Sequence, residues 1–181
     1  MIRCSLAAML VSFSALAQVQ ERAAILEHMK RLEPLVGAWS AVAMFHDPET
    51  PCDGTYLVQP VLGGTYLQFE VEWRRRSDHS RRSAFFIFVT WDPRAGKYVS
   101  TYFYTGSSLR VTETGELDEA AREFRTTAFV PLEDGVRDEN VRTALSLKDP
   151  SRLVYEHYSR YSNEPRERND LTVTLTRLAG F

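Results

Sequence analysis

His157 is the side chain whose type and position best suit chemistry in this sequence. Leu153, Tyr155 and His157 share one face of a predicted strand. Glu156 and Arg160 take the opposite face, so the imidazole of His157 is predicted to point inward. There it could ligate haem iron, hydrogen-bond a ligand or act as a base. The commoner alternative is a core histidine bonded to a tyrosine or to a backbone carbonyl.

Aromatic side chains predicted to point inward form a second group. A cavity lined mainly by apolar rings, with a few polar groups, is typical of small-molecule sites. The same residues also fit an ordinary packed core, but about ten strands give a barrel a wider interior than about eight. We therefore predict a pocket for a small, largely apolar molecule. Its predicted ligand-binding residues are Phe69, Trp73, Phe85, Trp91, Thr143, Tyr155 and His157, with Thr65 as a further polar group.

Arginines gather between residues 74 and 82. They could grip phosphate or carboxylate groups, and an anionic lipid surface suits an exported protein better than nucleic acid does. A solvated hairpin tip explains the same charges and is the explanation we favour. The formal net charge of −2 provides no overall basic field, so no nucleic-acid partner is expected.

Motifs that specify a reaction are absent from the sequence. The chain has no Gly-x-Ser-x-Gly, no His-Glu-x-x-His or other metal-ligand spacing, and no glycine-rich phosphate loop. We assign no catalytic residue and no metal site. Catalytic groups also assemble from distant strands, however. A small-molecule enzyme therefore stays open as an alternative, with His157 as acid or base and Tyr155 or Tyr102 as its partner.

The first seventeen residues have the pattern of a secretory signal. Arg3 precedes an apolar stretch from Leu6 to Leu16, and a small-x-small cleavage site precedes Gln18. The stretch is shorter than the roughly 20 apolar residues of a membrane helix. We therefore predict a signal peptide over residues 1–17 and an exported product, periplasmic or extracellular, without a membrane span.

Periodicity predicts one helix and then strands. Ala23, Leu26 and Met29 recur at helical spacing in a predicted helix that Pro34 ends. After this helix the period changes to two, most clearly in the predicted strand from Thr65 to Arg75. The strand faces predicted to point inward are Leu67, Phe69, Val71 and Trp73; Val141, Thr143, Leu145 and Leu147; and Leu171, Val173 and Leu175.

Turn-forming residues divide the chain after Val36 into about ten such strands. The predicted turns include residues 46–54, Gly63-Gly64 and residues 92–96. We predict an all-β fold, an antiparallel up-and-down barrel over residues 35–181, with a short helix over residues 18–34 that caps one end. Cys52 has no cysteine partner after export, and we favour its burial as a small apolar residue.

One predicted strand is apolar on both faces. Phe85 and Trp91 share its inward face, whereas Phe86 and Phe88 point outward. An apolar outer face calls for a cover, either the helix or a partner. The oligomeric state stays open, with a dimer through the Phe86 and Phe88 face as one possibility. A filled barrel that acts as a structural or interaction protein through this face is a further alternative.

The ordered set of motifs resembles that of the calycins, the lipocalin-like group of ligand-binding barrels. Gly37-x-Trp39 begins the first strand, and Thr174-Leu175-Thr176-Arg177 ends the last. The chain is more similar to a bacterial family of exported, calycin-like domains of unknown function. The motifs of that family are Leu35-Val36-Gly37-x-Trp39, Val61-Leu62-Gly63-Gly64-x-Tyr66-Leu67 and Trp91-Asp92-x-x-x-x-Lys97-Tyr98. The resemblance implies that Arg177 lies over Trp39 at the closed end of the barrel, as a structural pair.

The nitrobindin branch of these barrels binds haem through a histidine on a late strand and begins with Gly-x-Trp-x-Gly-x-Gly. Here Ala41 and Ala43 replace the two later glycines, and residues 169–178 contain no histidine. We therefore expect no cofactor, with haem on His157 as an alternative.

Overall fold

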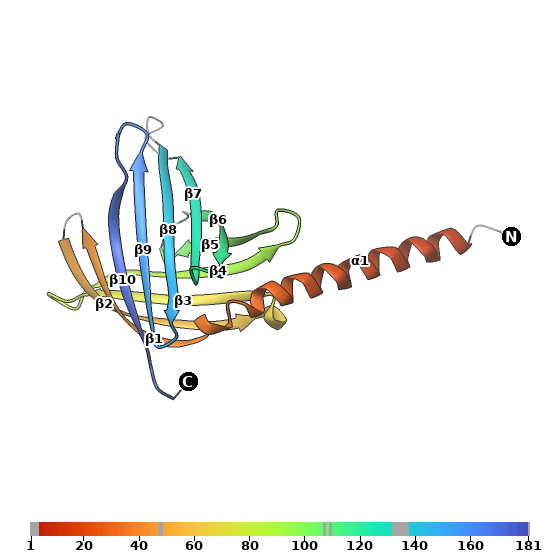
Figure 1. The fold of residues 1–181 in the computed structure, drawn as a ribbon, viewed down its shortest axis with the longest axis horizontal. Coiled ribbons are helices and arrows are strands. Elements are labelled where there is room, and N and C mark those ends of the chain that lie inside the picture. Colours follow the sequence, from red (N-terminus) through yellow and green to blue (C-terminus); the bar gives the residue numbers. More distant parts are fainter. Residues whose placement is uncertain (1–3, 47–48, 107, 109, 132–137, 181) are drawn as a thin grey trace.

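The polypeptide forms a closed antiparallel barrel preceded by one helix (Figure 1). The structure, a computed structural model, describes residues 4–46, 49–106, 108, 110–131 and 138–180. Its strands are β1 (Gly37–His46), β2 (Glu49–Val61), β3 (Tyr66–Arg75), β4 (Arg81–Asp92), β5 (Lys97–Tyr104), β6 (Arg110–Asp118), β7 (Glu123–Pro131), β8 (Asp138–Asp149), β9 (Arg152–Tyr161) and β10 (Arg168–Arg177). Each strand pairs with its neighbour in the sequence, and β10 pairs with β1. The predicted up-and-down barrel is confirmed.

The strand register places the predicted apolar faces inside the barrel. In β3, Leu67, Val71 and Trp73 are buried, and they alternate with exposed or half-buried polar side chains. Because successive residues of a strand point to opposite faces, a two-residue period fixes which side chains fill the interior. The same alternation is confirmed for β8 and β10, where the buried residues include Val141, Thr143, Leu147, Leu171, Val173 and Leu175.

The first predicted turn, residues 46–54, is wrong in extent. Strand β1 continues to His46 and β2 already begins at Glu49, so Cys52 and Gly54 lie inside a strand. Cys52 is buried, as expected. Gly54 allows close packing, because a Cβ atom there would lie 2.3 Å from Cδ1 of Trp73. The glycine therefore makes room for a large ring on the neighbouring strand.

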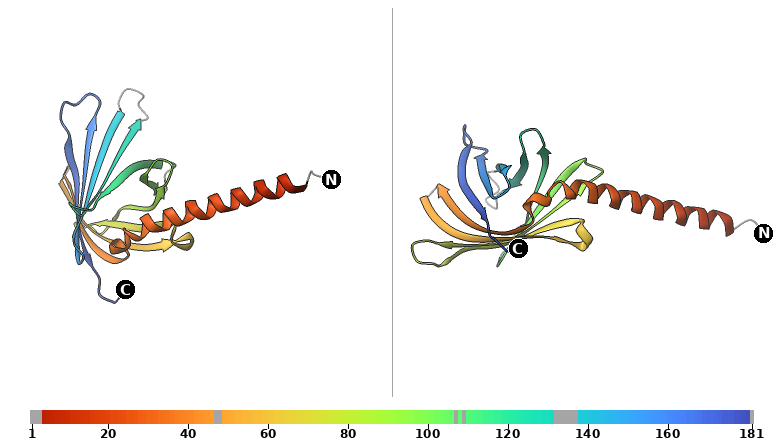
Figure 2. Two further views of the ribbon diagram at one scale, coloured as in Figure 1. Left: turned by 45° about the vertical axis from the view of Figure 1, so that its right-hand side comes forward. Right: turned by 60° about the horizontal axis from the view of Figure 1, so that its bottom comes forward.

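The helix α1 (Cys4–Lys30) is longer than the predicted one and ends earlier (Figures 1 and 2). It includes the apolar stretch of the predicted signal, which contains no glycine or proline to break it. Pro34 does not end α1, because it lies in a separate 3₁₀ turn, η1 (Glu33–Leu35). No helix among the described residues is long and apolar enough to cross a membrane.

The chain that follows α1 closes one end of the barrel. Met29, Leu32 and Leu35 are buried there. The indole N–H of Trp39 donates a 2.9 Å hydrogen bond to the carbonyl of Leu35. The guanidinium of Arg177 lies 4.1 Å from the centre of the Trp39 ring, which confirms the expected pair. The start of α1, by contrast, projects away from the barrel (Figure 2).

The outer face of β4 carries the predicted apolar side chains. Phe86 is 36% exposed, and Phe88 packs edge-to-face on Phe103 with 5.7 Å between the ring centres. The residues of α1 that approach β4 lie near Trp91 and Pro93, at the far end of this strand. A dimer through the Phe86 and Phe88 face stays a prediction.

Candidate functional site

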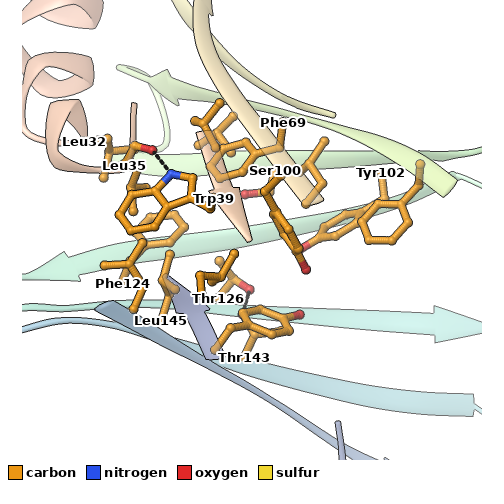
Figure 3. A pocket seen from close by; sticks show the side chains of 18 of the residues that line it. Leu32, Leu35, Trp39, Phe69, Ser100, Tyr102, Phe124, Thr126, Thr143 and Leu145 are labelled. Atoms are coloured by element: carbon orange, nitrogen blue, oxygen red, sulfur yellow. Dashed lines mark hydrogen bonds between the residues drawn. The ribbon is translucent and has the colours of Figure 1, made fainter. Parts of the chain in front are cut away.

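The barrel interior contains two adjoining spaces. A small cavity of about 80 Å³ lies near the closed end (Figure 3). A larger chamber of about 750 Å³ opens at the other end of the barrel. Trp73, Phe85, Tyr102 and Tyr155 line both spaces, so these side chains form the boundary between them.

The small cavity is almost entirely apolar. Leu32 and Leu35 close it at one end, and Trp39, Phe69 and Leu145 contribute to its walls (Figure 3). Its polar lining comes mainly from hydroxyl groups, and those of Tyr102, Thr126 and Thr143 are hydrogen-bonded inside the barrel. Such a space suits a few carbon atoms and disfavours water, which needs polar partners.

Glu113 is the buried acidic residue of the interior, and it was missed by the sequence analysis. It lies on β6 with only 3% of its surface exposed, and it lines the open chamber. The hydroxyl of Tyr102 donates a 3.0 Å hydrogen bond to Oε2 of Glu113, and the hydroxyl of Thr126 donates a second bond to the same oxygen. Thr126 also shares a 2.6 Å hydrogen bond with Thr143.

The environment of Glu113 makes its ionisation less favourable than it is in water. Burial removes the carboxylate from water and raises its pKa, whereas the hydrogen bonds from Thr126 and Tyr102 act in the opposite direction and do not cancel the effect. The alternation of β6, which turns Val111, Glu113 and Gly115 to one face, was the signal that could have revealed an inward carboxyl group.

His157 lines the open chamber, as predicted, and is half-buried on β9. Among the described residues, its side chain has no hydrogen-bond partner, so the expected bond to a tyrosine or a carbonyl is not found. Burial lowers the pKa of His157, and the charge of Asp170 partly offsets this. The imidazole is therefore mainly neutral at pH 7 and available to a ligand.

The other histidines lie elsewhere in the fold. The ring of His28, on α1, stacks on Trp91, and Nε2 of His46 lies 3.1 Å from the hydroxyl of Thr172. His79 lies in the loop between β3 and β4. No group of three or more His, Cys, Asp or Glu side chains suited to a metal ion occurs among the described residues.

The rim of the chamber carries further acidic side chains. Glu139 and Asp170 line it together with Glu113. Burial raises the pKa of Glu139, and the negative charge of Asp170 adds to this shift. Arg82 is the basic side chain of the lining, and its guanidinium lies 4.3 Å from the centre of the Phe45 ring. The acidic groups of the chamber therefore outnumber the basic ones.

The structure brings together most of the predicted ligand-binding residues. Phe69 and Thr143 line the small cavity, Trp73, Phe85 and Tyr155 line both spaces, and His157 lines the open chamber. Trp91 is the exception and lines neither. Its ring lies 3.6 Å from that of His28, nearly parallel to it, because α1 covers this end of β4. Thr65 likewise lines the outer groove beside α1.

The proposed partners of His157 are engaged with other groups. Tyr102 donates to Glu113 rather than to His157. Burial raises the pKa of Tyr102 and of Tyr155 well above 10, so both remain hydrogen-bond donors at neutral pH. An acid–base pair of His157 with either tyrosine is not formed in this structure.

The arginines near the β3–β4 loop contact acidic and aromatic neighbours. The guanidinium of Arg76 binds Asp53 through two hydrogen bonds, and Arg74 pairs with Glu72. Arg81 lies 3.7 Å from the same Glu72. These contacts fit a solvated hairpin end, because much of the positive charge is already balanced.

The surroundings of His157 do not fit haem. A haem group brings a wide apolar ring and two anionic propionates. The chamber instead presents the carboxyl groups of Glu113, Glu139 and Asp170 beside His157. Negative charges that lie close together in a partly buried site repel one another, so the propionates of haem would be unfavourable beside these carboxyl groups. We therefore assign no haem-dependent chemistry to this chamber.

The fold and the interior define this protein as a closed antiparallel β-barrel with an internal chamber. A family model described as "Protein of unknown function (DUF1579)" matches residues 26–177, and the chain belongs to this family. The crystal structure of Rv2717c from M. tuberculosis is similar, with a TM-score of 0.62 and 13% sequence identity over 83% of this chain and 96% of that chain. That likeness supports the fold. A search of curated proteins found no match.

Proposed function

We propose that this protein binds a small, largely apolar molecule that carries one polar group. The observation that carries the proposal is the open chamber of about 750 Å³, which is continuous in its lining with a small apolar cavity. Ligand pockets have volumes of about 300–1,000 Å³ and combine apolar walls with a few polar groups. Here aromatic rings form the walls, and Glu113 and His157 supply the polar groups.

A filled barrel with a purely structural role fits these observations less well. Side chains that serve only to pack an interior leave few voids larger than a water molecule. An inward carboxyl group is also costly in a packed core, because burial penalises it without any gain in binding. A ligand that fills the chamber and contacts Glu113 explains both features.

The proposal is tested by the binding of an apolar fluorophore. N-phenyl-1-naphthylamine is uncharged at neutral pH, and its emission shifts to the blue in an apolar site. We expect saturable binding to the wild-type protein. Val141→Phe places extra volume in the chamber and should abolish the signal, whereas Val42→Phe, at a position 48% exposed on the barrel exterior, should not. Absence of saturable binding, or equal binding by Val141→Phe, contradicts the proposal.

A small-molecule enzyme on the same chamber is a second candidate. It is favoured by the imidazole of His157, which has no hydrogen-bond partner in the part of the chain that the structure describes. A neutral imidazole is suited to accept a proton from a bound substrate. Native mass spectrometry of protein purified from its own host tests both candidates, because a retained molecule would identify the chemical class. A retained ligand that has no transferable proton within reach of His157 would contradict the proposal that the protein is an enzyme.

Export of the mature protein is also part of the proposal. Cleavage between Ala17 and Gln18 would leave the end of α1 attached, with Met29 and Leu32 still buried against the barrel. The side chains from Gln18 to Ala23, directly after the predicted cleavage site, are exposed. N-terminal sequencing of protein recovered outside the cytoplasm should begin at Gln18. Recovery of the intact chain starting at Met1 in the cytoplasm contradicts export.

A further inference from the structure

We propose that the ligand of the open chamber is an organic cation, an alkyl- or arylammonium compound whose positive head lies against Glu113. This inference rests on the proposed function and adds the chemical class of the ligand. Its evidence is the charge of the chamber, the free oxygen of Glu113 and the aromatic walls.

The charge of the chamber favours a cation over an anion. Glu113, Glu139 and Asp170 line it, and Arg82 is the arginine of its described lining. Arg168 lies 3.6 Å from Asp170 and balances the charge of that carboxylate, so Glu113 and Glu139 carry the argument. The guanidinium of Arg82 already lies over the ring of Phe45. An anionic ligand would meet Glu113 and Glu139 in a partly enclosed space, where like charges repel more strongly than in water. An ammonium group would instead relieve their mutual repulsion.

Glu113 has an oxygen atom available for such a ligand. Both of its hydrogen bonds fall on Oε2, and Oε1 accepts none from the described residues. The side chain is nearly fully buried and lines the chamber. Oε1 is not among the fully buried polar atoms that lack a partner, so a donor in the chamber can reach it. An ammonium group supplies both the donor and the opposite charge.

Aromatic rings surround the same space. Trp73 and Phe85 meet edge-to-face with 5.3 Å between ring centres, and Phe85 lies 5.5 Å from Tyr104. The rings of Tyr102 and Tyr104 are stacked 6.5 Å apart. The negative faces of aromatic rings attract organic cations, and the attraction is stronger where water is excluded. Apolar walls of this kind also accommodate the hydrocarbon part of an amine.

A bare metal ion is a poorer occupant of this chamber. Calcium and magnesium need several oxygen ligands within about 2.6 Å of one point. The described carboxyl groups do not gather in this way, since no group of three or more suitable side chains occurs among them. An ammonium head on an apolar body uses one carboxylate and the aromatic walls instead.

Binding of the cation should depend on pH. Burial raises the pKa of Glu113, so a proton competes with the ammonium group for this carboxylate. Affinity is therefore expected to rise as the pH increases through the pKa of Glu113. The titratable and charged groups around Glu113 are Tyr102 and Tyr104 of β5, Tyr155 and His157 of β9, Glu139 of β8, Asp170 of β10 and Arg82 of β4.

The test compares three probes of similar shape by isothermal titration calorimetry: 2-phenylethylammonium, 2-phenylethanol and 3-phenylpropanoate. At pH 7.5 we expect the ammonium compound to bind at least about tenfold more tightly than the alcohol, and the carboxylate to bind most weakly. The preference for the ammonium compound should decline as the pH is lowered from 7.5 toward 4.5, the ordinary pKa of a glutamate, because a proton then competes for Glu113. Binding of the uncharged alcohol should change little over this range.

Glu113→Gln keeps the shape of the side chain and removes its charge, so it should abolish the preference. Glu116→Gln is the matched control, because Glu116 lies on the same strand with its side chain exposed on the outside. Glu139→Gln should reduce the preference without altering the contact between Tyr102 and Glu113. If Glu113→Gln fails to fold, Glu139→Gln still tests the role of the chamber's charge.

The outcomes separate this inference from the proposed function. If N-phenyl-1-naphthylamine binds in the chamber but the ammonium compound is not preferred, or Glu113→Gln and Glu139→Gln both retain the preference, the inference is wrong and the proposed function stands. If neither the fluorophore nor any of the three probes binds, both are wrong. Preference lost in Glu113→Gln and kept in Glu116→Gln supports both.

Discussion

The hydroxyl of Tyr102 donates a 3.0 Å hydrogen bond to Oε2 of Glu113, and this contact joins β5 to β6 inside the barrel. Thr126 of β7 donates to the same oxygen, so three neighbouring strands contribute to one carboxyl group. Burial nevertheless outweighs these bonds and raises the pKa of Glu113. A group held so specifically, but at a cost to the folded state, is typical of a functional site.

Glu113→Gln is expected to increase the free energy of unfolding at pH 7.5. A carboxyl group whose pKa is raised by folding imposes no penalty below its unfolded pKa, and its ionisation destabilises the folded state as the pH rises through the folded pKa. Glutamine has no such ionisation, and its side-chain oxygen accepts the bonds from Tyr102 and Thr126. Urea unfolding between pH 4.5 and pH 8 should therefore show a growing advantage for the variant.

The control for this experiment is Glu116→Gln. The side chain of Glu116 is exposed, so its replacement should leave the pH dependence of unfolding close to that of the wild-type protein. A Glu113→Gln variant that is less stable than the wild type at every pH would mean that Glu113 is a structural group. Gain of stability together with loss of ammonium preference is the signature of a binding residue.

Arg177→Met is expected to lower the free energy of unfolding by about 2–4 kcal/mol. The guanidinium of Arg177 lies over Trp39 and donates hydrogen bonds to the carbonyls of Pro34 and Val36. Methionine retains apolar contact but leaves these carbonyls without their charged donor. Urea unfolding provides the measurement, with Arg94→Ala at an exposed turn as the control. Equal stability of the two variants would show that the closed end does not depend on Arg177.

Much of the fold could be predicted from sequence, because the period of two determines which side chains point inward. The faces of β3, β8 and β10 follow directly from it. The turn over residues 46–54 could not be placed correctly from the sequence. Pro51 and Gly54, which are typical of turns, lie within strand β2 in the structure. Gly54 is required by the ring of Trp73 on the next strand, which is a tertiary contact.

The candidate site was predictable only in part. The alternation of strand residues predicts that Trp73, Phe85 and His157 point inward. It does not predict which inward side chains leave a cavity between them. Trp91 has the right parity and is nevertheless covered by His28, because α1 reaches this end of β4. Glu113 also lies at an inward position of its strand. The neighbouring residues include threonines, however, so the sequence of this strand has no apolar face that would mark the side toward the interior. Its role depends on donors from two neighbouring strands.

Gly54→Ala is expected to destabilise the barrel by about 1–3 kcal/mol. The added Cβ would lie 2.3 Å from Cδ1 of Trp73 and 2.7 Å from the carbonyl oxygen of Glu72, so the ring and the backbone must both shift. Urea unfolding and the near-ultraviolet circular dichroism of the tryptophans should both change. Thr55→Ala, at the exposed neighbouring position, is the control. An unchanged spectrum and stability for Gly54→Ala would contradict the packing described for Trp73.

Acidification is expected to weaken the packing of α1 against the barrel. The ring of His28 stacks on Trp91, and burial together with the positive charge of Arg31 lowers the pKa of His28. For a histidine whose pKa is lowered by folding, the contribution to stability is complete above its unfolded pKa of about 6.5 and is lost as the pH falls toward the folded pKa. The free energy of unfolding should therefore decrease more between pH 7.5 and pH 5.5 in the wild type than in His28→Phe.

The comparison with His28→Phe isolates one histidine, because the other three are present in both proteins. Phenylalanine can stack on Trp91 without gaining a proton. His79→Asn, in the loop between β3 and β4, should retain the wild-type dependence on pH, and asparagine tolerates the positive φ of 57° found there. Identical dependence on pH in the wild type and His28→Phe would show that the stacked ring is not the group that titrates.

Titration with haemin tests the remaining alternative for His157. We expect no protein-dependent shift of the Soret band, because the imidazole shares its chamber with Glu113, Glu139 and Asp170, whose charges oppose the propionates of haem. Absorbance spectra of wild type and His157→Ala should therefore be the same at each haemin concentration. A saturable shift that is present in the wild type and absent in His157→Ala would establish haem ligation by this residue. It would also require that the carboxyl groups of the chamber be protonated or displaced, which a decrease of haemin affinity with rising pH would reveal.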